Sequence, residues 1–258
     1  MNKDATKADK QAFYLLKAVN KALHRYRMLA TGDRVLAAVS GGKDSLTLLD
    51  LLHRYQRYAK EHYQLMVAMI RTDYHCGRTV TPEWLQAWCA QRGIPFELEE
   101  LQVAGELAHL TGMSTCFRCA WLRRKALFSL AGRLGCNKIA FGHHADDIAE
   151  TALMNLFYNA RLQRMAPKIA LFDGHLVVIR PLAFVEERDI VPFVRASLFP
   201  IEGGPCPAGQ DSRRALMKKL LREVEDDCHD VKRHIYRAVE HYEVAVQGKG
   251  MSEEEHHA

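Results

Sequence analysis

Short apolar segments alternate with longer amphipathic segments between residues 34 and 159, and this alternation constrains the fold more than any other feature of the sequence. The segments expected to be strands are 34–39, 63–70, 94–101 and 136–142, and those expected to be helices are 45–58, 81–93, 119–135 and 146–159. Strands that alternate with helices of this length form a parallel sheet with helices on both faces. The sequence therefore predicts an α/β fold with a doubly wound parallel sheet.

The flanking segments extend this core at both ends. Residues 7–29 place Leu15, Val19 and Leu23 at helical spacing and predict an N-terminal amphipathic helix. Residues 168–182 predict a hairpin that turns at Asp173-Gly174. Further helices are expected at 185–198, 211–223 and 228–246, so the chain should end in a helical extension.

A loop suited to phosphate follows the first expected strand and precedes the first helix after it. The loop consists of Ser40, Gly41, Gly42, Lys43, Asp44 and Ser45. Its glycines allow backbone amides to approach an anion, and the helix N-terminus adds partial positive charge. A Walker A loop is excluded, because position 37 is alanine and Asp44 follows the lysine. A plain strand-to-helix turn is the alternative.

The Ser-Gly-Gly-x-Asp-Ser pattern resembles the pyrophosphate loop of the ATP pyrophosphatase superfamily. The resemblance implies that the loop holds the β- and γ-phosphates of ATP and that the substrate is adenylated with release of pyrophosphate. Lys43 and Asp44 are then the expected catalytic residues of the loop. The adenine should lie between the ends of the first two strands, with Ile70 as a candidate for backbone contact.

A second motif, FGHHADD at 141–147, follows another expected strand and opens a helix. Gly142, Asp146 and Asp147 are expected at the same sheet edge as the phosphate loop, in contact with ATP. Asp147 is a candidate ligand for Mg²⁺, which prefers one or two carboxylates together with phosphate oxygens. The two aspartates could instead only cap the helix, and His143 and His144 as zinc ligands form a third alternative.

Three of the seven cysteines stand in contexts that indicate chemistry. Cys116 and Cys119 form a Cys-x-x-Cys pair at the start of an expected helix, and Cys206 lies in a glycine- and proline-rich loop. The residues themselves allow three kinds of site. One is a zinc site, for which the sequence offers no clear fourth ligand. The others are a redox dithiol and a four-iron cluster with one open iron. We expect the other cysteines to be structural or incidental, namely Cys76, Cys89, Cys136 and Cys228.

Five segments occur in a fixed order along the chain: the phosphate loop, CFRCAWLRRKAL, NKIAFGHHADDIAETALMNLFY, MAPK and VVIRPLAF. Together they resemble the tRNA 2-thiocytidine synthetase family over about residues 10–225. The resemblance implies that Cys116, Cys119 and Cys206 hold a [4Fe-4S] cluster that carries sulfur to a cytidine of the tRNA anticodon loop, at position 32. It also implies a sulfur donor such as a cysteine desulfurase and allows a homodimer. One departure is Gly209, which stands where enterobacterial-type members carry a fourth cysteine.

The chain has a net charge of +5, and such a charge favours binding to nucleic acid only where the basic residues are clustered. Clustered basic residues are therefore candidates for binding tRNA phosphates. The expected tRNA-binding residues are Lys17, Lys21, Arg25, Arg161, Arg164 and Lys168. Two further clusters are Arg123, Arg124 and Lys125, and Arg213, Arg214, Lys218 and Lys219. Each cluster could instead be an ordinary solvated surface.

These observations predict three regions: a basic helix at 1–30, an ATP-binding domain with a Cys-x-x-Cys insertion at 31–200, and the Cys206 loop with C-terminal helices at 201–258. We expect a cytoplasmic chain without a membrane segment, because no apolar run is long enough to span a bilayer. Two other functions stay open at this point: an ATP-dependent ligase of lysidine-synthetase type, and a redox- or iron-sensing nucleotide-binding protein without turnover.

Overall fold

The computed structural model describes residues 3–73, 77, 79–105, 115–204 and 212–254. These residues form two compact units. The first unit contains the sheet and comprises residues 1–144 and 167–210, and the second comprises residues 145–166 and 211–258. Cys76 and Cys206, for which the sequence predicts roles, lie outside the described residues.

A six-stranded sheet forms the centre of the first unit, in the order β3-β2-β1-β4-β6-β5. Its strands are β1 (Arg34–Ala38), β2 (Gln64–Thr72), β3 (Phe96–Leu101), β4 (Lys138–Phe141), β5 (Lys168–Leu171) and β6 (Leu176–Ile179). All neighbouring pairs are parallel except β5 and β6, which are antiparallel. The prediction of a mostly parallel sheet is therefore confirmed, and β5 is its antiparallel edge strand.

The middle strands are apolar on both sides because helices cover both faces of the sheet. Along β1 and just after it, Val35, Ala37 and Val39 belong to one buried cluster. Leu36 and Ala38 belong to the other. The period of two along a strand directs these two sets to opposite faces.

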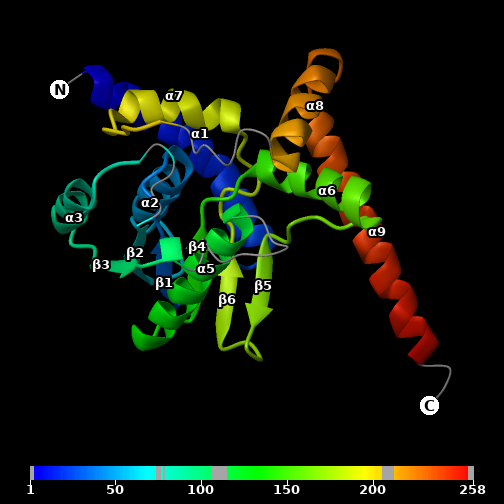
Figure 1. Cartoon of the computed structure of the whole chain (residues 1–258), viewed down its shortest axis with the longest axis horizontal. Coiled ribbons are helices and arrows are strands. Elements are labelled where there is room, and N and C mark those ends of the chain that lie inside the picture. The colour runs from blue at the N-terminus through cyan, green and yellow to red at the C-terminus, as the bar shows by residue number, and fades with distance from the viewer. Residues whose placement is uncertain (1–2, 74–76, 78, 106–114, 205–211, 255–258) are drawn as a thin grey trace. The chain divides into compact units, whose positions relative to one another are not determined.

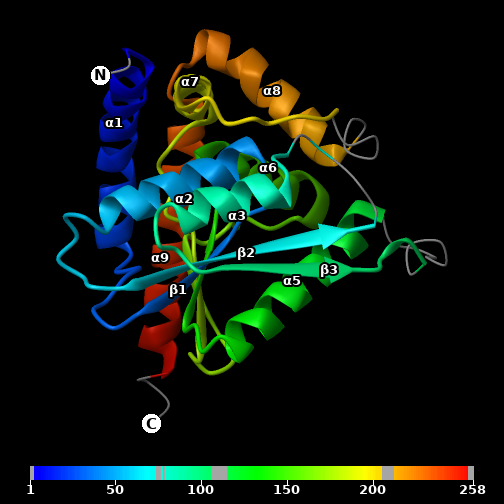
Figure 2. The ribbon, with the colours of Figure 1, turned by 90° about the vertical axis from the view of Figure 1, so that its left-hand side faces the viewer.

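Among the described helices of the first unit, one group packs on one face of the sheet and a single helix packs on the other (Figures 1 and 2). The first group is α1 (Lys3–Arg25), α2 (Lys43–Tyr55), α3 (Pro82–Ala90) and α7 (Glu187–Ser197), and the opposite face carries α5 (Thr115–Arg133). Figure 2 shows α2 and α3 on one side of β2 and β3, with α5 on the other side. The predicted doubly wound arrangement is confirmed.

The predicted hairpin is formed by β5 and β6, and its turn needs a left-handed backbone. Phe172, Asp173 and Gly174 all have positive φ angles, of 52°, 54° and 89°. Glycine takes this conformation at no steric cost and aspartate tolerates it better than most residues. This local chemistry explains why the turn could be located from the sequence.

The second unit consists of three helices: α6 (Ala145–Asn159), α8 (Arg213–Asp227) and α9 (Val231–Glu254). Helix α6 contacts both α8 and α9 (Figure 1). Ser212 caps α8 by accepting a hydrogen bond from the Ala215 amide, as expected of a serine at this position. The predicted C-terminal helices are thus present, and α6 joins them although 52 residues separate Asn159 from Ser212.

The boundaries of the three predicted regions, at residues 30 and 200, stay a prediction. Within the first unit, α1 packs on α7 and α2 through Ala12, Leu15 and Val19, which are buried. Among the described helices, none has the length and apolar character needed to cross a membrane.

Candidate functional site

The phosphate loop lies between β1 and α2, where the sequence placed it. Gly42 is the N-cap of α2, with extended backbone angles, and Lys43 is the first helical residue. Gly41 has a φ of +82°, which residues with a side chain rarely adopt. The chain therefore leaves β1 through a left-handed turn and enters α2 with its first amide groups at the carboxyl edge of the sheet.

Two glycines of the motifs are required by close packing. A Cβ atom on Gly41 would lie 3.1 Å from the Thr79 Cβ atom and 3.2 Å from the Val80 amide nitrogen. A Cβ atom on Gly142 would lie 2.9 Å from the carbonyl oxygen of Asp44. The GHH segment therefore packs directly against the first turn of α2, which brings the two sequence motifs together in the first unit.

Charged side chains surround the first turn of α2. The Lys43 Nζ atom donates to both carboxylate oxygens of Asp44 at 2.8 Å and lies 3.0 Å from a carboxylate oxygen of Glu187 at the start of α7. His144, which is buried, places Nε2 3.6 Å from the Asp44 carboxylate. Glu187 is a residue that the sequence reasoning missed.

Burial lowers the pKa of the Lys43 amine, but the carboxylates of Asp44 and Glu187 outweigh this effect and raise the pKa above its ordinary value. The amine therefore keeps its positive charge throughout the physiological pH range. A fixed positive charge beside free helix amides is the combination that stabilises negative charge on phosphate.

The two serines of the loop hold its shape. Ser45 Oγ donates to the Gly42 carbonyl oxygen at 2.9 Å and lies 3.2 Å from Ser40 Oγ. The Gly42 amide is 3.4 Å from Ser40 Oγ. Ser45 is buried and Ser40 is exposed. The serines thus link both sides of the glycine pair, and Ser40 keeps a hydroxyl group at the surface.

Ile70 is a buried residue of β2, two residues before the strand ends. The register pairs Ala38, the last residue of β1, with Ala68. Alternate residues of a parallel strand direct their backbone groups to the same neighbour, so Ile70 directs its backbone toward the β1 side, just past the end of β1. This position fits the expected backbone contact with adenine, which stays a prediction.

Asp146 and Asp147 belong to the second unit, in the first turn of α6. Asp146 is buried, and its carboxylate forms an ion pair with the Lys232 amine at a distance of 2.7 Å. Asp147 accepts a hydrogen bond from Arg214 at 2.8 Å. Both carboxylates therefore hold the three helices of this unit together, and their expected contact with ATP or Mg²⁺ stays a prediction.

The Cys-x-x-Cys pair lies in the first turns of α5. Cys119 is buried, with 6% of its surface exposed, and the helix places Cys116 one turn earlier in the chain. The side chain of Cys116 and all of Cys206 lie outside the described residues. Within the described part of the chain, no group of three histidine, cysteine or acidic residues is arranged to hold a metal ion.

Two of the remaining cysteines are structural. Cys89 and Cys136 are buried, and burial raises the pKa of the Cys89 thiol to about 11. Cys228 ends α8, with its sulfur 3.5 Å from His234 Nδ1. A thiol with a raised pKa is a poor nucleophile and a poor metal ligand at neutral pH.

The basic residues expected to bind tRNA have different surroundings. Lys17, Lys21 and Arg25 are exposed on α1, and Lys17 Nζ lies 4.7 Å from the centre of the Phe13 ring. Lys168 is exposed and donates to the Arg27 carbonyl oxygen at 2.6 Å.

Arg161 and Arg164 belong to the second unit, and they differ in exposure. Arg161 is exposed. Arg164 is buried, with 9% of its surface exposed, and its guanidinium group binds Glu240 at 3.3 Å and Glu243 at 2.9 Å. The structure therefore assigns Arg164 a packing contact with α9 rather than a place on the surface.

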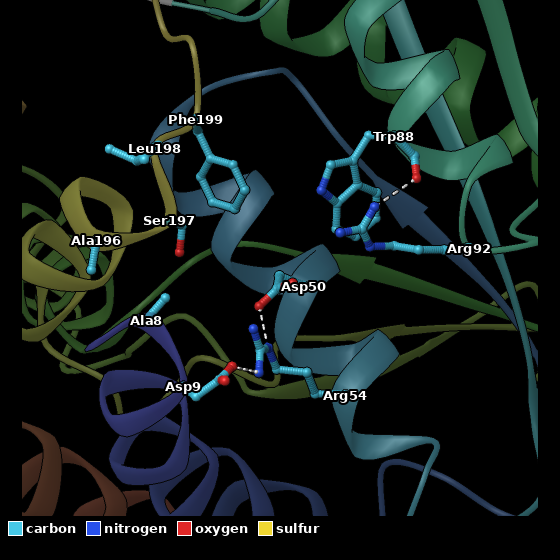
Figure 3. A pocket seen from close by; sticks show the side chains of 10 residues that line it. All are labelled: Ala8, Asp9, Asp50, Arg54, Trp88, Arg92, Ala196, Ser197, Leu198 and Phe199. Atoms are coloured by element: carbon cyan, nitrogen blue, oxygen red, sulfur yellow. Dashed lines mark hydrogen bonds and ion pairs between the residues drawn. The ribbon is translucent and has the colours of Figure 1, made fainter. Parts of the chain in front are cut away.

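A cavity of about 270 Å³ lies between α1, α2, α3 and the end of α7 (Figure 3). Figure 3 shows Arg54 between two carboxylates, with Asp9 at 2.7 Å and Asp50 at 2.6 Å. Arg92 lies across the Trp88 ring, 3.8 Å from its centre. Asp50 is about two turns of α2, roughly 10 Å, from Lys43. The cavity is therefore separate from the phosphate loop, and its charges serve to join the helices.

Beside this cavity, His53 makes stability depend on pH. Its Nδ1 atom is buried and has no hydrogen-bond partner among the described residues. Burial, together with the nearby Arg92, lowers the pKa of His53. The unfolded chain therefore binds a proton at a higher pH than the folded chain does, so stability falls as the pH drops below about 6.5.

We expect His53→Gln to reduce the loss of thermal stability between neutral pH and about pH 5, measured as the shift in Tm. His62→Gln, at an exposed position, serves as the control. Equal Tm shifts in the wild type and in His53→Gln would show that His53 does not contribute to this dependence.

The comparisons with known proteins show the family of the chain. The model of the PP-loop domain family matches residues 14–224. The tRNA-cytidine(32) 2-sulfurtransferase of Geobacter sulfurreducens is 40% identical over 226 residues, which cover 86% of this chain and 87% of that protein. The enzyme of the same name from Paracidovorax citrulli is 37% identical and covers 86% of this chain and 71% of its own length.

A solved structure shares the fold. The U34-tRNA thiolase NcsA from Methanococcus maripaludis, solved with its [4Fe-4S] cluster, superposes with a TM-score of 0.72 at 22% identity, covering 91% of this chain and 79% of that one. The sequence match over most of the chain and the phosphate loop between β1 and α2 lead to one conclusion. The chain belongs to the tRNA 2-thiocytidine synthetase family of PP-loop ATP pyrophosphatases.

Proposed function

We propose that the protein is an ATP-dependent tRNA sulfurtransferase that converts cytidine 32 of the anticodon loop to 2-thiocytidine. The observation that carries this proposal is the phosphate loop, with Lys43 and the free amides of α2 at the carboxyl edge of the sheet. The family relatives, whose names state this reaction, supply the substrate in the proposal.

The chemistry needs a leaving group on the base. The carbonyl oxygen of the pyrimidine attacks the α-phosphorus of ATP, the bond to the β-phosphate oxygen breaks, and pyrophosphate leaves. A sulfur nucleophile then adds to the activated carbon, and AMP departs with the original oxygen. Lys43 and the amides of the loop stabilise the charge that develops on pyrophosphate, a contribution typically worth about a hundred to a thousand-fold in rate.

We propose that Ser40, Gly41, Gly42, Lys43, Asp44 and Ser45 bind the phosphates. Ile70 and Gly142 complete the part of the ATP site that belongs to the first unit. Asp146 and Asp147 remain proposed contributors from the second unit. Asp147 is the carboxylate we propose for Mg²⁺, and it would have to exchange its ion pair with Arg214 for the metal.

The cysteine set fits a cluster better than zinc. Cys119 is buried, and Cys116 lies three residues earlier in α5. Three thiolates satisfy three irons of a [4Fe-4S] cluster and leave one iron open, whereas structural zinc needs a fourth ligand. Cys116, Cys119 and Cys206 would hold this cluster, which would supply the sulfur at its open iron.

The proposed contacts for tRNA phosphates are the exposed basic residues of α1, together with Arg161 and Lys168. The residues of α1 are Lys17, Lys21 and Arg25. Arg164 is left out of this proposed surface because Glu240 and Glu243 bind its guanidinium group. A cysteine desulfurase as sulfur donor and a homodimer remain part of the proposal.

Nucleoside analysis of tRNA from a strain that lacks this gene tests the proposal. We expect 2-thiocytidine to be absent from that tRNA by mass spectrometry and to return when the wild-type gene is restored. The matched control is the gene for Lys43→Ala, which we expect not to restore it. An unchanged nucleoside profile in the deletion strain would refute the proposed substrate.

A further inference from the structure

Helix α5 carries an exposed stripe that combines aromatic and basic side chains. Phe117, Trp121, Arg124 and Lys125 are exposed, and their spacing of three, four and seven residues places them on one side of the helix. Phe117 and Trp121 have 60% and 40% of their surface exposed. The opposite side of the helix, which includes Ala126, Leu127 and Leu130, is buried against the sheet. We call the exposed residues the α5 stripe.

The charge of α5 is entirely positive. Its sequence, TCFRCAWLRRKALFSLAGR, contains basic residues and no aspartate or glutamate. Arg133, in its last turn, pairs with Glu99. Around Trp121, the Arg118 guanidinium lies 4.6 Å and the Lys125 amine 5.5 Å from the ring centre. An exposed indole between two cations is complementary to a base and its phosphates.

The topology places the start of this stripe at the same edge of the sheet as the phosphate loop. Helix α5 connects the carboxyl end of β3 to the amino end of β4, so it runs back across the sheet and its first turns lie at the carboxyl edge. The phosphate loop lies at the same edge, after β1. Cys119 is buried, whereas Phe117 and Trp121, two residues before and two residues after it, are exposed.

We propose that the α5 stripe binds unpaired nucleotides of the tRNA anticodon loop, with Trp121 stacking on a base next to the one that is modified. This inference rests on the proposed function, and it deepens that proposal by naming the surface that holds the loop. Sequence reasoning considered the basic residues of α5 but not its aromatic ones. Proteins that bind single-stranded nucleic acid commonly combine aromatic stacking with a basic surface.

The strengths of the competing contacts favour the base. An exposed cation–π contact contributes about two- to fivefold to an equilibrium, whereas stacking of one base on an aromatic side chain contributes about five- to one-hundred-and-fifty-fold. A base can therefore displace the exposed Lys125 side chain from the Trp121 ring. The displaced amine stays close enough to bind the adjoining phosphate, so the ion pair adds to the stack.

Binding of two RNAs to the full-length protein tests this inference. One RNA is the stem–loop of the anticodon arm, and the other is the same stem closed as a perfect duplex without unpaired bases. We expect Trp121→Ala to weaken binding of the stem–loop about tenfold, with no change for the duplex. Trp121→Phe should restore most of the affinity. Trp121→Leu keeps an apolar but non-aromatic side chain and should bind as weakly as the alanine variant.

The salt dependence separates stacking from charge. Trp121→Ala should leave the slope of log Kd against log salt unchanged, whereas Lys125→Ala should reduce it by about 0.7, as expected for one phosphate of a single strand. Tyr58→Ala is the control, because Tyr58 is an exposed aromatic residue just after the last turn of α2, at the other edge of the sheet. It should bind both RNAs as the wild type does.

The outcomes distinguish this inference from the proposed function. Failure of the wild-type protein to bind either RNA would overturn both. Wild-type binding that Trp121→Ala leaves unchanged would overturn the stacking surface alone. An equal loss for stem–loop and duplex would also overturn it, since no unpaired base would be involved. Trp121→Ala could also keep its RNA affinity but lose self-association, as measured by light scattering. That result would overturn the inference too, because it would make the α5 stripe an interface between protein chains.

Discussion

Lys43→Ala should lower tRNA-dependent release of pyrophosphate from ATP by about a hundred to a thousand-fold. Lys43 carries the only full positive charge of the six-residue phosphate loop, and the carboxylates of Asp44 and Glu187 keep its amine protonated. Removing this charge leaves the developing pyrophosphate to the amides of α2 alone. We expect the loss mainly in kcat, because the charge on the leaving group grows in the transition state.

Two variants serve as controls for this effect. Lys43→Arg keeps the charge but changes its geometry, and it should recover part of the rate. Glu187→Gln keeps Lys43 in place and removes one of the two carboxylates beside it, so it should change the rate far less than Lys43→Ala does. Full pyrophosphate release by Lys43→Ala would show that the loop does not stabilise the leaving group.

Cys119→Ala should abolish thiolation while tRNA-dependent pyrophosphate release continues. In the proposed function, Cys119 belongs to the sulfur-delivering half of the reaction, whereas the phosphate loop performs the adenylation. Loss of a thiolate from a three-cysteine set leaves one iron without its protein ligand. The measurement is 2-thiocytidine in the tRNA product beside pyrophosphate in the same reaction, with iron content determined on the purified, anaerobically handled protein.

Cys136→Ala is the matched control, since Cys136 is a buried cysteine of the core that packs near Met66. This variant should retain iron, pyrophosphate release and thiolation. Normal thiolation by Cys119→Ala would remove the cysteine from the proposed mechanism and favour an ATP-dependent ligase that uses the phosphate loop without the cysteines. A circular-dichroism spectrum like that of the wild type excludes misfolding as the cause of any loss.

The fold could be predicted because its signals are local. Strands β1, β2 and β4 are short, mostly apolar segments next to a helical pattern, and the hairpin of β5 and β6 carries Asp173-Gly174 at its turn. The predicted ends were less accurate: β2 continues to Thr72, two residues beyond the expected end. Residue preferences alone place strand ends poorly, because the ladder with a neighbouring strand decides where pairing stops.

The site could be predicted only where its residues are close in sequence. The phosphate loop depends on a contiguous pattern, and the structure confirms its place between β1 and α2. Two residues show the limit of prediction from sequence, because each takes its role from a partner far along the chain. Glu187 pairs with Lys43. Arg164 pairs with Glu240 and Glu243. Such pairs have no local signal in a single sequence, so a surface role for Arg164 was as reasonable as a buried one.

The most direct test of the central claim is to identify the nucleotide products of a reaction with purified protein, tRNA, ATP and a sulfide source under anaerobic conditions. The proposed mechanism predicts AMP and pyrophosphate, with one AMP formed for each 2-thiocytidine, since cleavage occurs at the α-phosphorus. Formation of ADP and phosphate, or of 2-thiocytidine without any cleavage of ATP, would contradict it.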